Sequence, residues 1–430
     1  MTSSVVILSY QPGEWLAEAV GSVVDQADEV VVVDNGSRSA EASLIARRAG
    51  ARVVRSERNL GFAGGVNLGV ASTTGDVIAL LNDDAVAGAE WLQRAEEVLA
   101  DPDVAAVGPK IRLAAAYREV LLPDHHVAPA DHRSLGRRLR SVTVEGVEVI
   151  DELLGGLYAF EESDGDRWRW STAGRPWYVP LPAAATDEGA PVGGIAQAVE
   201  VLIDGQVAPR GATCRLINSA GVYLRPDGYA GDVGLGAPDD GRFDQRQDRF
   251  ALSGTALVLR AETWHRIGPL ASPFFAYYED IDWCWRANLA GLRLVYDPAA
   301  SVDHRRSATS GGASAVRVMA ERNRTLSMVR NGPLPKTLAA LAQRWKEGSD
   351  GGVREAIARQ LPWAIATRLS GWAWRSAADL PAYRKARALW AGGVRPAPGA
   401  PTATGRTRAG VWRQWAGIDN AWDDSPVRPG

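Results

Sequence analysis

The sequence predicts an α/β protein built on a Rossmann-like, mostly parallel sheet with helices on both faces. Within the first 110 residues, short runs rich in Val, Ile and Leu alternate with amphipathic segments. These runs are apolar throughout, which is typical of parallel strands buried on both faces. The expected strands are 4–10, 29–34, 51–56, 76–82 and 104–109, and the expected helices are 13–26, 38–49, 61–73 and 88–101.

The rest of the chain divides by composition. Residues 112–213 combine Pro- and Gly-rich stretches with short strand-like pieces, which predicts a β-rich insertion. Residues 214–331 predict a second compact part, with a strand at 253–260, a helix at 280–291 and a strand at 292–298. Residues 332–395 predict helices separated by Pro and Gly, and 396–430 predict a flexible tail rich in Pro, Gly and Thr.

Bulk composition excludes several classes of protein. A net charge of −3 over 430 residues argues against a general nucleic-acid binder, which is normally basic. Cys214 and Cys284 lack a metal-ligand spacing and fit a reducing compartment. The N-terminus does not resemble a signal peptide, and no apolar run approaches the roughly 20 residues needed to cross a bilayer. We therefore expect a cytoplasmic protein with no nucleic-acid partner.

The region 333–395 is basic, with eleven Lys and Arg against four acids, and eight of the 16 Trp follow residue 331. Basic helices with Trp suit peripheral contact with the anionic inner membrane surface. They also suit a helical pack folded on the main domain, with its basic residues in solvent. Both interpretations stay open at this point.

Polar residues follow the expected strands of the sheet. Ligands of such sheets bind beyond the carboxyl ends of the strands. Adjacent carboxylates at the end of a central strand suit Mg²⁺ or Mn²⁺ beside a diphosphate, although an Asx-rich turn would show the same residues. The residues at these ends are Tyr10, the run Asp34-Asn35-Gly36-Ser37, Asn59 and the run Asn82-Asp83-Asp84.

Asp34 stands where Rossmann-type sheets use an acid to hold a ribose or a base edge. A dinucleotide enzyme would need G-x-G-x-x-G after the first strand, but that position reads SYQPGEW. A mononucleotide site remains, and the helix that opens at Gly61 could offer backbone N–H groups to an anion.

The stretch FFAYYEDIDWCWR places Glu279, Asp280 and Asp282 among aromatic residues. Acidic residues favour the first turn of a helix, and a catalytic base in a partly dry pocket would look the same. His304 is either a structural residue or a metal ligand beside the arginines that follow it. Arg322 and Arg324 of the ERNR run add cations that could neutralise phosphate.

Together, the motifs VVILSYQP, VVVVDNGS, NLGFAGGVNLGV, LLNDDA, SGTALVLR, FFAYYEDIDWCWRANLAG, DHRRSAT and ERNRT resemble glycosyltransferase family 2. They are most similar to its rhamnosyltransferase-type members of bacterial cell-wall and polysaccharide synthesis, and the match covers roughly 4–110 and 214–331. The resemblance implies a GT-A fold, an NDP-sugar donor, a glycan or lipid-linked acceptor, Mg²⁺ or Mn²⁺, and inversion at the anomeric carbon. Residues 1–111 would form the nucleotide-sugar half and 214–331 the acceptor half.

The resemblance also assigns roles by position. Asp280 is the expected general base, supported by Glu279 and Asp282, and Asp84 with His304 is the expected metal site. Asn82 replaces the first acid of the family's D-x-D-type motif. The expected nucleotide or diphosphate contacts are Tyr10, Asp34, Asn59, Gly61, Asn82, Asp83, Arg322 and Arg324.

Inverting transfer needs one base to take the proton of the acceptor hydroxyl, unlike the paired carboxylates of most glycosidases. Two other functions stay open. A sugar-1-phosphate nucleotidylyltransferase would carry a Gly-rich basic loop after the first strand, which SYQPGEW lacks. A non-catalytic sugar-nucleotide or glycan-binding module would bind the donor without turning it over.

Overall fold

The computed structural model describes residues 1–13, 15–122, 133–182, 199–209, 211–305, 313–346 and 352–375. The described residues fall into two compact units. The first comprises Met1–Ile111, Ser219–Val233 and the described part of Arg242–Arg395; the second comprises the described parts of Arg112–Asn218 and Gly234–Gly241.

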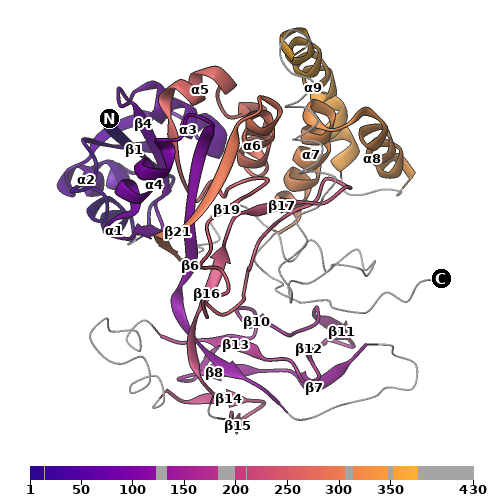
Figure 1. Cartoon of the computed structure of the whole chain (residues 1–430). Coiled ribbons are helices and arrows are strands. Elements are labelled where there is room, and N and C mark those ends of the chain that lie inside the picture. The colour runs from indigo at the N-terminus through magenta and orange to yellow at the C-terminus, as the bar shows by residue number, and fades with distance from the viewer. Residues whose placement is uncertain are drawn as a thin grey trace. The chain divides into compact units, whose positions relative to one another are not determined.

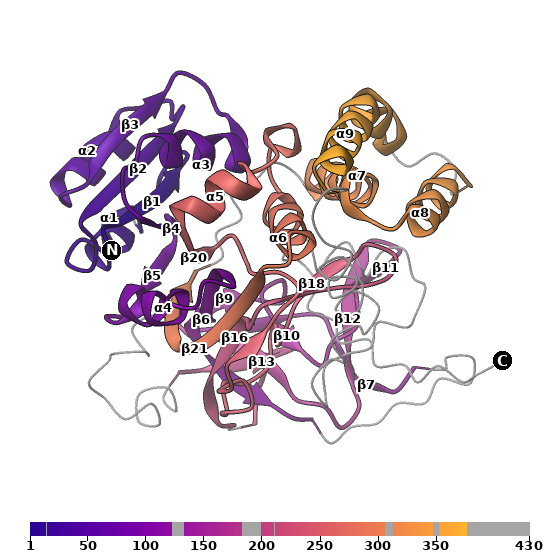
Figure 2. The same cartoon turned by 45° about the horizontal axis from the view of Figure 1, so that its top comes forward.

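The N-terminal part of the first unit, indigo in Figure 1, is built on a parallel sheet in the order β4-β1-β2-β3, and Figure 2 labels all four strands. Its strands are the uniformly apolar runs of the sequence, and Val5, Ile7, Val32, Ala79 and Leu81 lie in its core. The strands are β1 (Ser3–Ser9), β2 (Glu29–Asn35), β3 (Arg52–Ser56) and β4 (Val77–Asn82), and the helices between them and after them are α1 (Leu16–Gly21), α2 (Glu41–Arg48), α3 (Gly61–Ala71) and α4 (Trp91–Leu99).

One antiparallel strand enters this sheet. β20 (Ala256–Arg260) pairs antiparallel with β4 on one side and with β6 (Val104–Val120) on the other. The expected fifth strand, 104–109, is the first part of β6, which continues to residue 120. It is separated from β4 by β20 and is not its direct neighbour. The predicted α/β fold with helices flanking a sheet is confirmed, but the sheet is mixed and not mostly parallel. β4, β1, β2 and β3 pair parallel, whereas the strands that join the sheet by antiparallel pairing are β20, β6, β13 (Trp177–Pro180), β10 (Leu154–Gly155), β5 (Ala85–Ala87), β21 (Arg293–His304) and β19 (Gln247–Asp248).

The helix expected at 13–26 is shorter than predicted: α1 begins at Leu16 and ends at Gly21, and hydrogen-bonded turns continue the chain to Ala27. Another difference concerns β5 (Ala85–Ala87), a short strand inside the segment expected to be a turn. β5 pairs antiparallel with β21 (Arg293–His304), so that His304 stands opposite Ala85.

Between β20 and β21 the chain forms three short helical elements, α5 (Ala261–Ile267), η2 (Ser272–Phe274) and α6 (Glu279–Leu289). Shorter strands of the same unit are β17 (Val222–Leu224), β18 (Ala230–Asp232) and β19 (Gln247–Asp248). α6 begins one residue before the expected helix and places Glu279 and Asp280 in its first turn.

The C-terminal helical region contains α7 (Ala313–Asn331), α8 (Leu334–Lys346) and α9 (Val353–Arg375), which Figure 2 shows beside one another. The Trp363 ring meets the buried Phe274 ring edge-on at 5.9 Å. Arg344 pairs with the buried Glu321 of α7, and Arg368 donates to the Val329 carbonyl at 2.7 Å. In this part of the chain several basic and aromatic side chains are therefore packing groups, whereas the helical-pack interpretation placed the basic residues in solvent.

The expected tail 396–430 and Trp390, Trp412, Trp415 and Trp422 lie outside the described residues, as do the side chains of Trp372 and Trp374. Among the residues that the structure covers, no helix is both long enough and apolar enough to span a membrane.

The second unit is rich in short antiparallel strands. Its core contains Leu139, Val142, Trp177, Val179 and Ile203. The strands confined to residues 135–219 are β7 (Leu135–Leu139), β8 (Val142–Val144), β9 (Val147–Glu148), β10 (Leu154–Gly155), β11 (Glu161–Ser163), β12 (Asp166–Thr172), β13 (Trp177–Pro180), β14 (Val201–Ile203), β15 (Gln206–Val207) and β16 (Thr213–Ser219).

Candidate active site

The register of the parallel strands gathers the predicted polar residues at one edge of the first unit. Ser9 pairs with Asp34, so Tyr10 follows β1 beside the end of β2. Leu8 pairs with Asn82, which places the Asn82-Asp83-Asp84 run next to the end of β1. Because the carboxyl ends of parallel strands meet at one edge, residues distant in sequence become neighbours there.

Asp34 is fully buried at the end of β2 and makes several polar contacts. Its Oδ1 accepts from the Ser37 N–H at 3.1 Å, and its Oδ2 accepts from the Ser43 hydroxyl at 2.7 Å. Arg55, opposite Asp34 in the β2–β3 register, lies 3.2 Å from Oδ2. A nucleotide contact from Asp34 would have to share its carboxylate with these donors.

Asn35, to which the sequence assigned no contact of its own, shapes the loop after β3. Its amide donates to Asn59 Oδ1 and to the Gly61 carbonyl, both at 3.1 Å. Its Oδ1 accepts from the Leu60 N–H at 2.9 Å. The signal for it was its place beside Asp34 in the VVVVDNGS motif.

The start of α3 was expected to offer free backbone N–H groups to an anion, and this is wrong for the N–H groups of Gly61 and Ala63. The Gly61 N–H donates to Asn59 Oδ1 at 2.8 Å, and the Ala63 N–H donates to the Phe275 carbonyl at 3.0 Å. Gly61 has φ of +72°, and a Cβ there would lie 2.4 Å from the Phe275 oxygen. Glycine is required because the backbone of residue 275 approaches so closely.

Asp84 and His304, the predicted metal pair, are brought together by the β5–β21 pairing. His304 Nε2 lies 3.1 Å from Asp84 Oδ1, and both side chains are about nine-tenths buried. The Arg305 N–H donates to the Asp84 carbonyl at 3.0 Å, which fixes the end of β21 against the Asp84 turn.

A carboxylate and an imidazole form a donor set that suits Mn²⁺ and, less well, Mg²⁺. No group of three or more His, Cys, Asp or Glu side chains able to hold a metal occurs among the described residues. The pair therefore fits a divalent cation whose remaining ligands come from phosphate and water, not a closed protein cage.

Asp83 lies beside this pair and is partly buried. Burial raises the pKa of Asp83 to about 6, and the neighbouring Asp84 charge adds to the increase. Two adjacent carboxylates, one of them with its pKa raised by burial, are typical of a site that receives a positive ligand.

Asp280 is tied to the Asn82-Asp83-Asp84 edge through the turn Ser253–Thr255. The Asn82 N–H donates to the Thr255 carbonyl at 2.9 Å, and the Gly254 N–H donates to Asp280 Oδ2 at 2.9 Å. Asp280 Oδ1 accepts from the Ile281 N–H at 2.7 Å. Burial raises the pKa of Asp280 above its ordinary value, although these backbone donors oppose the increase.

Gly254 was not among the predicted site residues, and its place in the SGTALVLR motif was the only signal for it. A Cβ at Gly254 would lie 3.3 Å from the Phe62 ring and 3.4 Å from the Asp280 carboxylate. Glycine thus lets the turn reach Asp280 with its backbone.

The segment before α6 is strained. Phe275, Tyr277 and Tyr278 have φ of +68°, +69° and +71°, a left-handed region that bulky residues rarely adopt. Such strain persists only when the surroundings hold it, and it concentrates at functional sites. Of the aromatic residues around the three acids, Phe274, Tyr278, Trp283 and Trp285 are buried, whereas Phe275 is exposed and Tyr277 is half-buried.

Asn323 holds this segment. Its fully buried amide donates to the carbonyls of Phe274, Ala276 and Tyr277 at 2.7–2.9 Å. Arg322 donates to the Phe274 carbonyl at 2.7 Å and to Asn323 Oδ1 at 2.8 Å. The predicted diphosphate contact of Arg322 is therefore corrected to a role in shaping the segment before α6.

Arg324 is also engaged within the protein. It is buried, pairs with Glu321 at 2.8 Å and donates to the Asp227 carbonyl at 2.6 Å. Its guanidinium carbon lies 4.3 Å from the Tyr229 ring centre. The prediction that Arg324 contacts diphosphate or acceptor is wrong because its donors are directed to these groups.

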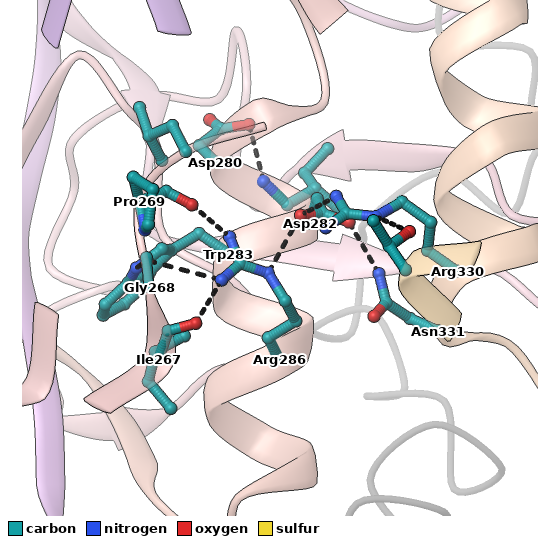
Figure 3. Close-up of polar contacts among 12 residues, drawn as sticks. Ile267, Gly268, Pro269, Asp280, Asp282, Trp283, Arg286, Arg330 and Asn331 are labelled. Carbon is teal, nitrogen blue, oxygen red and sulfur yellow. Dashed lines mark hydrogen bonds and ion pairs between the residues drawn. The ribbon is translucent and has the colours of Figure 1, made fainter. Parts of the chain in front are cut away.

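Asp282 is not available to a substrate. It is fully buried, and Figure 3 shows it between Arg286 of α6 and Arg330 and Asn331 of α7. Arg286 lies 3.0 Å and Arg330 2.5 Å from Oδ2, and the Asn331 amide donates to Oδ1 at 2.7 Å. Burial raises the pKa of Asp282, but the two arginines outweigh it and hold the pKa below its ordinary value. Its expected catalytic position is therefore corrected to a link between α6 and α7.

Glu279 differs from both other acids. It is 6% exposed, and its Oε2 is buried without a hydrogen-bond partner in the described protein. Burial raises the pKa of Glu279 well above its ordinary value, and the charges of Asp280 and Asp282 add to the increase.

The chain is similar to known proteins in its N-terminal part. Residues 4–137 match the family Glycosyl transferase family 2. An uncharacterized glycosyltransferase of Nostoc sp. is 34% identical over 114 residues, which cover 25% of this chain and 35% of that protein. An uncharacterized glycosyltransferase of Haemophilus influenzae is 24% identical over 100 residues, 21% of this chain and 30% of that protein. The chain thus spans about a third of the length of these curated relatives.

Among solved structures, GalNAc-T7 with UDP, GalNAc and Mn²⁺ superposes with a TM-score of 0.42 at 15% identity, over 84% of this chain and 57% of that one. The mannosyltransferase PcManGT from Pyrobaculum calidifontis, in complex with GDP-Man and Mn²⁺, gives 0.38 at 16% identity, over 98% of this chain and 87% of that one.

Proposed function

We propose that this protein is an inverting, metal-dependent glycosyltransferase that moves a sugar from an NDP-sugar to a glycan or polyprenyl-linked hydroxyl. The observation that carries the proposal is the turn Ser253–Thr255, which bonds to both Asn82 and Asp280. It connects a candidate base to the strand edge that holds the Asp84–His304 pair. The family match at residues 4–137 supports the same reaction class.

In the proposed reaction, Asp280 takes the proton of the acceptor hydroxyl as that oxygen attacks the anomeric carbon. The bond to the acceptor oxygen forms as the bond to the diphosphate oxygen breaks, so the anomeric configuration inverts. Asp84 and His304 would hold a divalent cation, which when bound stabilises the negative charge of the departing diphosphate. Asn323 and Arg322 keep the segment before Asp280 in its strained form.

The favoured donor is dTDP-L-rhamnose, on the resemblance of the motifs to rhamnosyltransferase-type sequences. A thermal-shift screen tests both function and donor, because a ligand that binds only the folded state raises the unfolding temperature. We expect dTDP-rhamnose with Mn²⁺ to raise it more than UDP-glucose or GDP-mannose with Mn²⁺, and more than either component alone. A larger shift with another sugar nucleotide would make that nucleotide the proposed donor in place of dTDP-rhamnose. If no sugar nucleotide gave a shift that depends on Mn²⁺, the proposed function would be contradicted.

The alternatives differ in their products. A sugar-1-phosphate nucleotidylyltransferase would release pyrophosphate from a nucleoside triphosphate, and a binding module would leave the donor intact. Slow Mn²⁺-dependent hydrolysis of the donor without an acceptor would favour the transferase over both.

We also propose peripheral contact of α8 with the inner membrane surface, at its cytoplasmic face. Leu334, Leu338 and Trp345 are exposed and lie on one face of the helix at helical spacing, and Lys336 and Lys346 are exposed beside them. The protein is expected to sediment with phosphatidylglycerol vesicles and not with phosphatidylcholine vesicles. Leu338→Glu together with Trp345→Glu should abolish sedimentation, since both side chains are exposed and the fold does not need them. Equal sedimentation of the double variant would exclude this face.

A further inference from the structure

One turn of α6 holds three carboxyl groups that receive different sets of donors. Asp282 lies between two arginines and an asparagine amide. Asp280 accepts from the backbone N–H groups of Gly254 and Ile281. The side chain of Glu279 has no hydrogen bond to another described residue, and its Oε2 is buried.

These donor sets favour different protonation states. Hydrogen bonds to an ionised oxygen and adjacent cations favour the charged form, whereas burial without either favours the neutral form. Asp282 has cations and Asp280 has backbone donors, so both are suited to carry charge. Glu279 has neither.

The charges around Glu279 point in the same direction. Asp280 and Asp282 of its own helix are the charged groups that act on it in the described chain, and both are negative. The cations that reach this turn, Arg286 from α6 and Arg330 from α7, are directed to Asp282 (Figure 3). An ionised Glu279 would place a third negative charge in the turn with no cation to compensate it.

We propose that Glu279 is a neutral positioning acid: it keeps its proton while Asp280 is ionised, and its free carboxyl group hydrogen-bonds a sugar hydroxyl of the substrate. The inference rests on the proposed function, which supplies the sugar. A protonated carboxyl offers both a donor and an acceptor, which matches a hydroxyl group. Buried polar atoms are nearly always bonded, so the orphaned Oε2 indicates a partner that arrives with the ligand.

The proton balance of the reaction does not involve Glu279. The acceptor proton moves to Asp280 and then to solvent, and Glu279 is protonated before and after transfer. Its neutral state spares Asp280 a like charge one residue away, which would otherwise raise the pKa of the base and reduce its ionised fraction.

The first test compares Glu279→Gln with Glu279→Leu in acceptor-dependent transfer. Gln has the size and neutrality of the protonated acid and can still donate and accept, so we expect kcat and the acceptor KM to stay within about threefold of wild type. Leu removes the hydrogen bond and should raise the acceptor KM by about tenfold, with kcat changed less. A loss of about a hundredfold in Glu279→Gln would overturn the proposal, because the carboxylate charge would then be essential. Unchanged kinetics in both variants would exclude the contact with substrate.

The second test needs no activity. The ordinary pKa of a glutamate carboxyl is 4.5, and that of Glu279 is raised in the folded protein. Above pH 4.5 the folded protein therefore keeps a proton that the unfolded chain has lost. The free energy of unfolding of the wild type consequently falls as the pH rises above 4.5. Glu279→Gln lacks this group. The melting temperature of the variant minus that of wild type should therefore increase between pH 5 and pH 7. A constant difference over this range would show that Glu279 is ionised in the folded protein.

The two tests separate the inference from the proposed function. A wild-type protein without metal-linked donor binding or transfer contradicts the function, while the pH dependence of melting still reports the protonation of Glu279. Asp248→Asn, at an exposed acid paired with Arg293, is the matched control in which a carboxylate is replaced at the surface.

Discussion

Replacing Asp280 with asparagine is expected to reduce sugar transfer by about a hundredfold or more, while nucleotide and metal affinity stays within about threefold of wild type. Asparagine keeps the size of the side chain and can still accept the Gly254 N–H, but it cannot take a proton from the acceptor. Initial rates with a saturating donor and acceptor, together with calorimetric titration of NDP and Mn²⁺, measure the two properties separately.

The pH dependence of the wild-type rate adds a check on the base. Because burial raises the pKa of Asp280, the rate should fall with decreasing pH at a value above the ordinary 3.8 of an aspartate. Asp248→Asn is the matched control, since it replaces an exposed acid that pairs with Arg293 and has no role in the proposed site. Full activity of Asp280→Asn would exclude Asp280 as the base, and equal losses in both variants would point to a general effect on the fold and not to the loss of a base.

The sequence predicted the parts of this site that depend on strand order and chain direction. Apolar runs fix which segments enter the parallel sheet, and polar residues directly after them must then meet at its carboxyl edge. Asp34, Asn59 and Asp83 are placed this way. The Asp84–His304 pair also depends on the β5–β21 register, and the resemblance of DHRRSAT to a family motif anticipated it, although β5 itself was not predicted.

What the sequence could not supply was the partner of each charged side chain. Arg322 and Arg324 look like phosphate ligands because they are cations in a short run, but their donors are directed to backbone carbonyls and to Glu321. Asn323 between them holds the strained segment through three carbonyls, and nothing local in ERNR announces it. The distinct donor sets of Glu279, Asp280 and Asp282 likewise depend on the turn before β20, which supplies Gly254, and on α7, which supplies Arg330 and Asn331.

The backbone conformation of Phe275, Tyr277 and Tyr278, which have positive φ values, could not be predicted from the sequence either. Propensity argues against each of them, and each costs free energy of order 1–3 kcal/mol that tertiary contacts must offset. Local preference therefore fails at the segment that presents the candidate base, which is where functional constraint is expected to override it.

Replacing Asp84 with alanine is expected to abolish the Mn²⁺-dependent part of nucleotide binding and to reduce transfer by about a hundredfold or more. Asp84 supplies the carboxylate of a two-residue protein donor set, and His304 alone is a weak site for a hard cation. The remaining binding should be independent of metal, since Asp34 and the strand ends around it stay in place. Thermal shifts with NDP, with and without Mn²⁺ and after chelation of the metal, measure this difference directly.

Two further variants give this test its discrimination. His304→Ala should weaken the metal-linked shift without removing it, because the Asp84 carboxylate is the harder ligand and phosphate oxygens contribute as well. Asp101→Ala removes an exposed carboxylate that pairs with Arg293 at 2.9 Å, and it should leave the metal-linked shift unchanged. If Asp84→Ala kept the full Mn²⁺ dependence, the cation would have to bind elsewhere, and the Asp84–His304 contact would be a structural bond between the β4–β5 turn and the end of β21. If Asp101→Ala also lost the Mn²⁺-dependent shift, the loss in Asp84→Ala would reflect the overall charge of the protein and not a specific metal site.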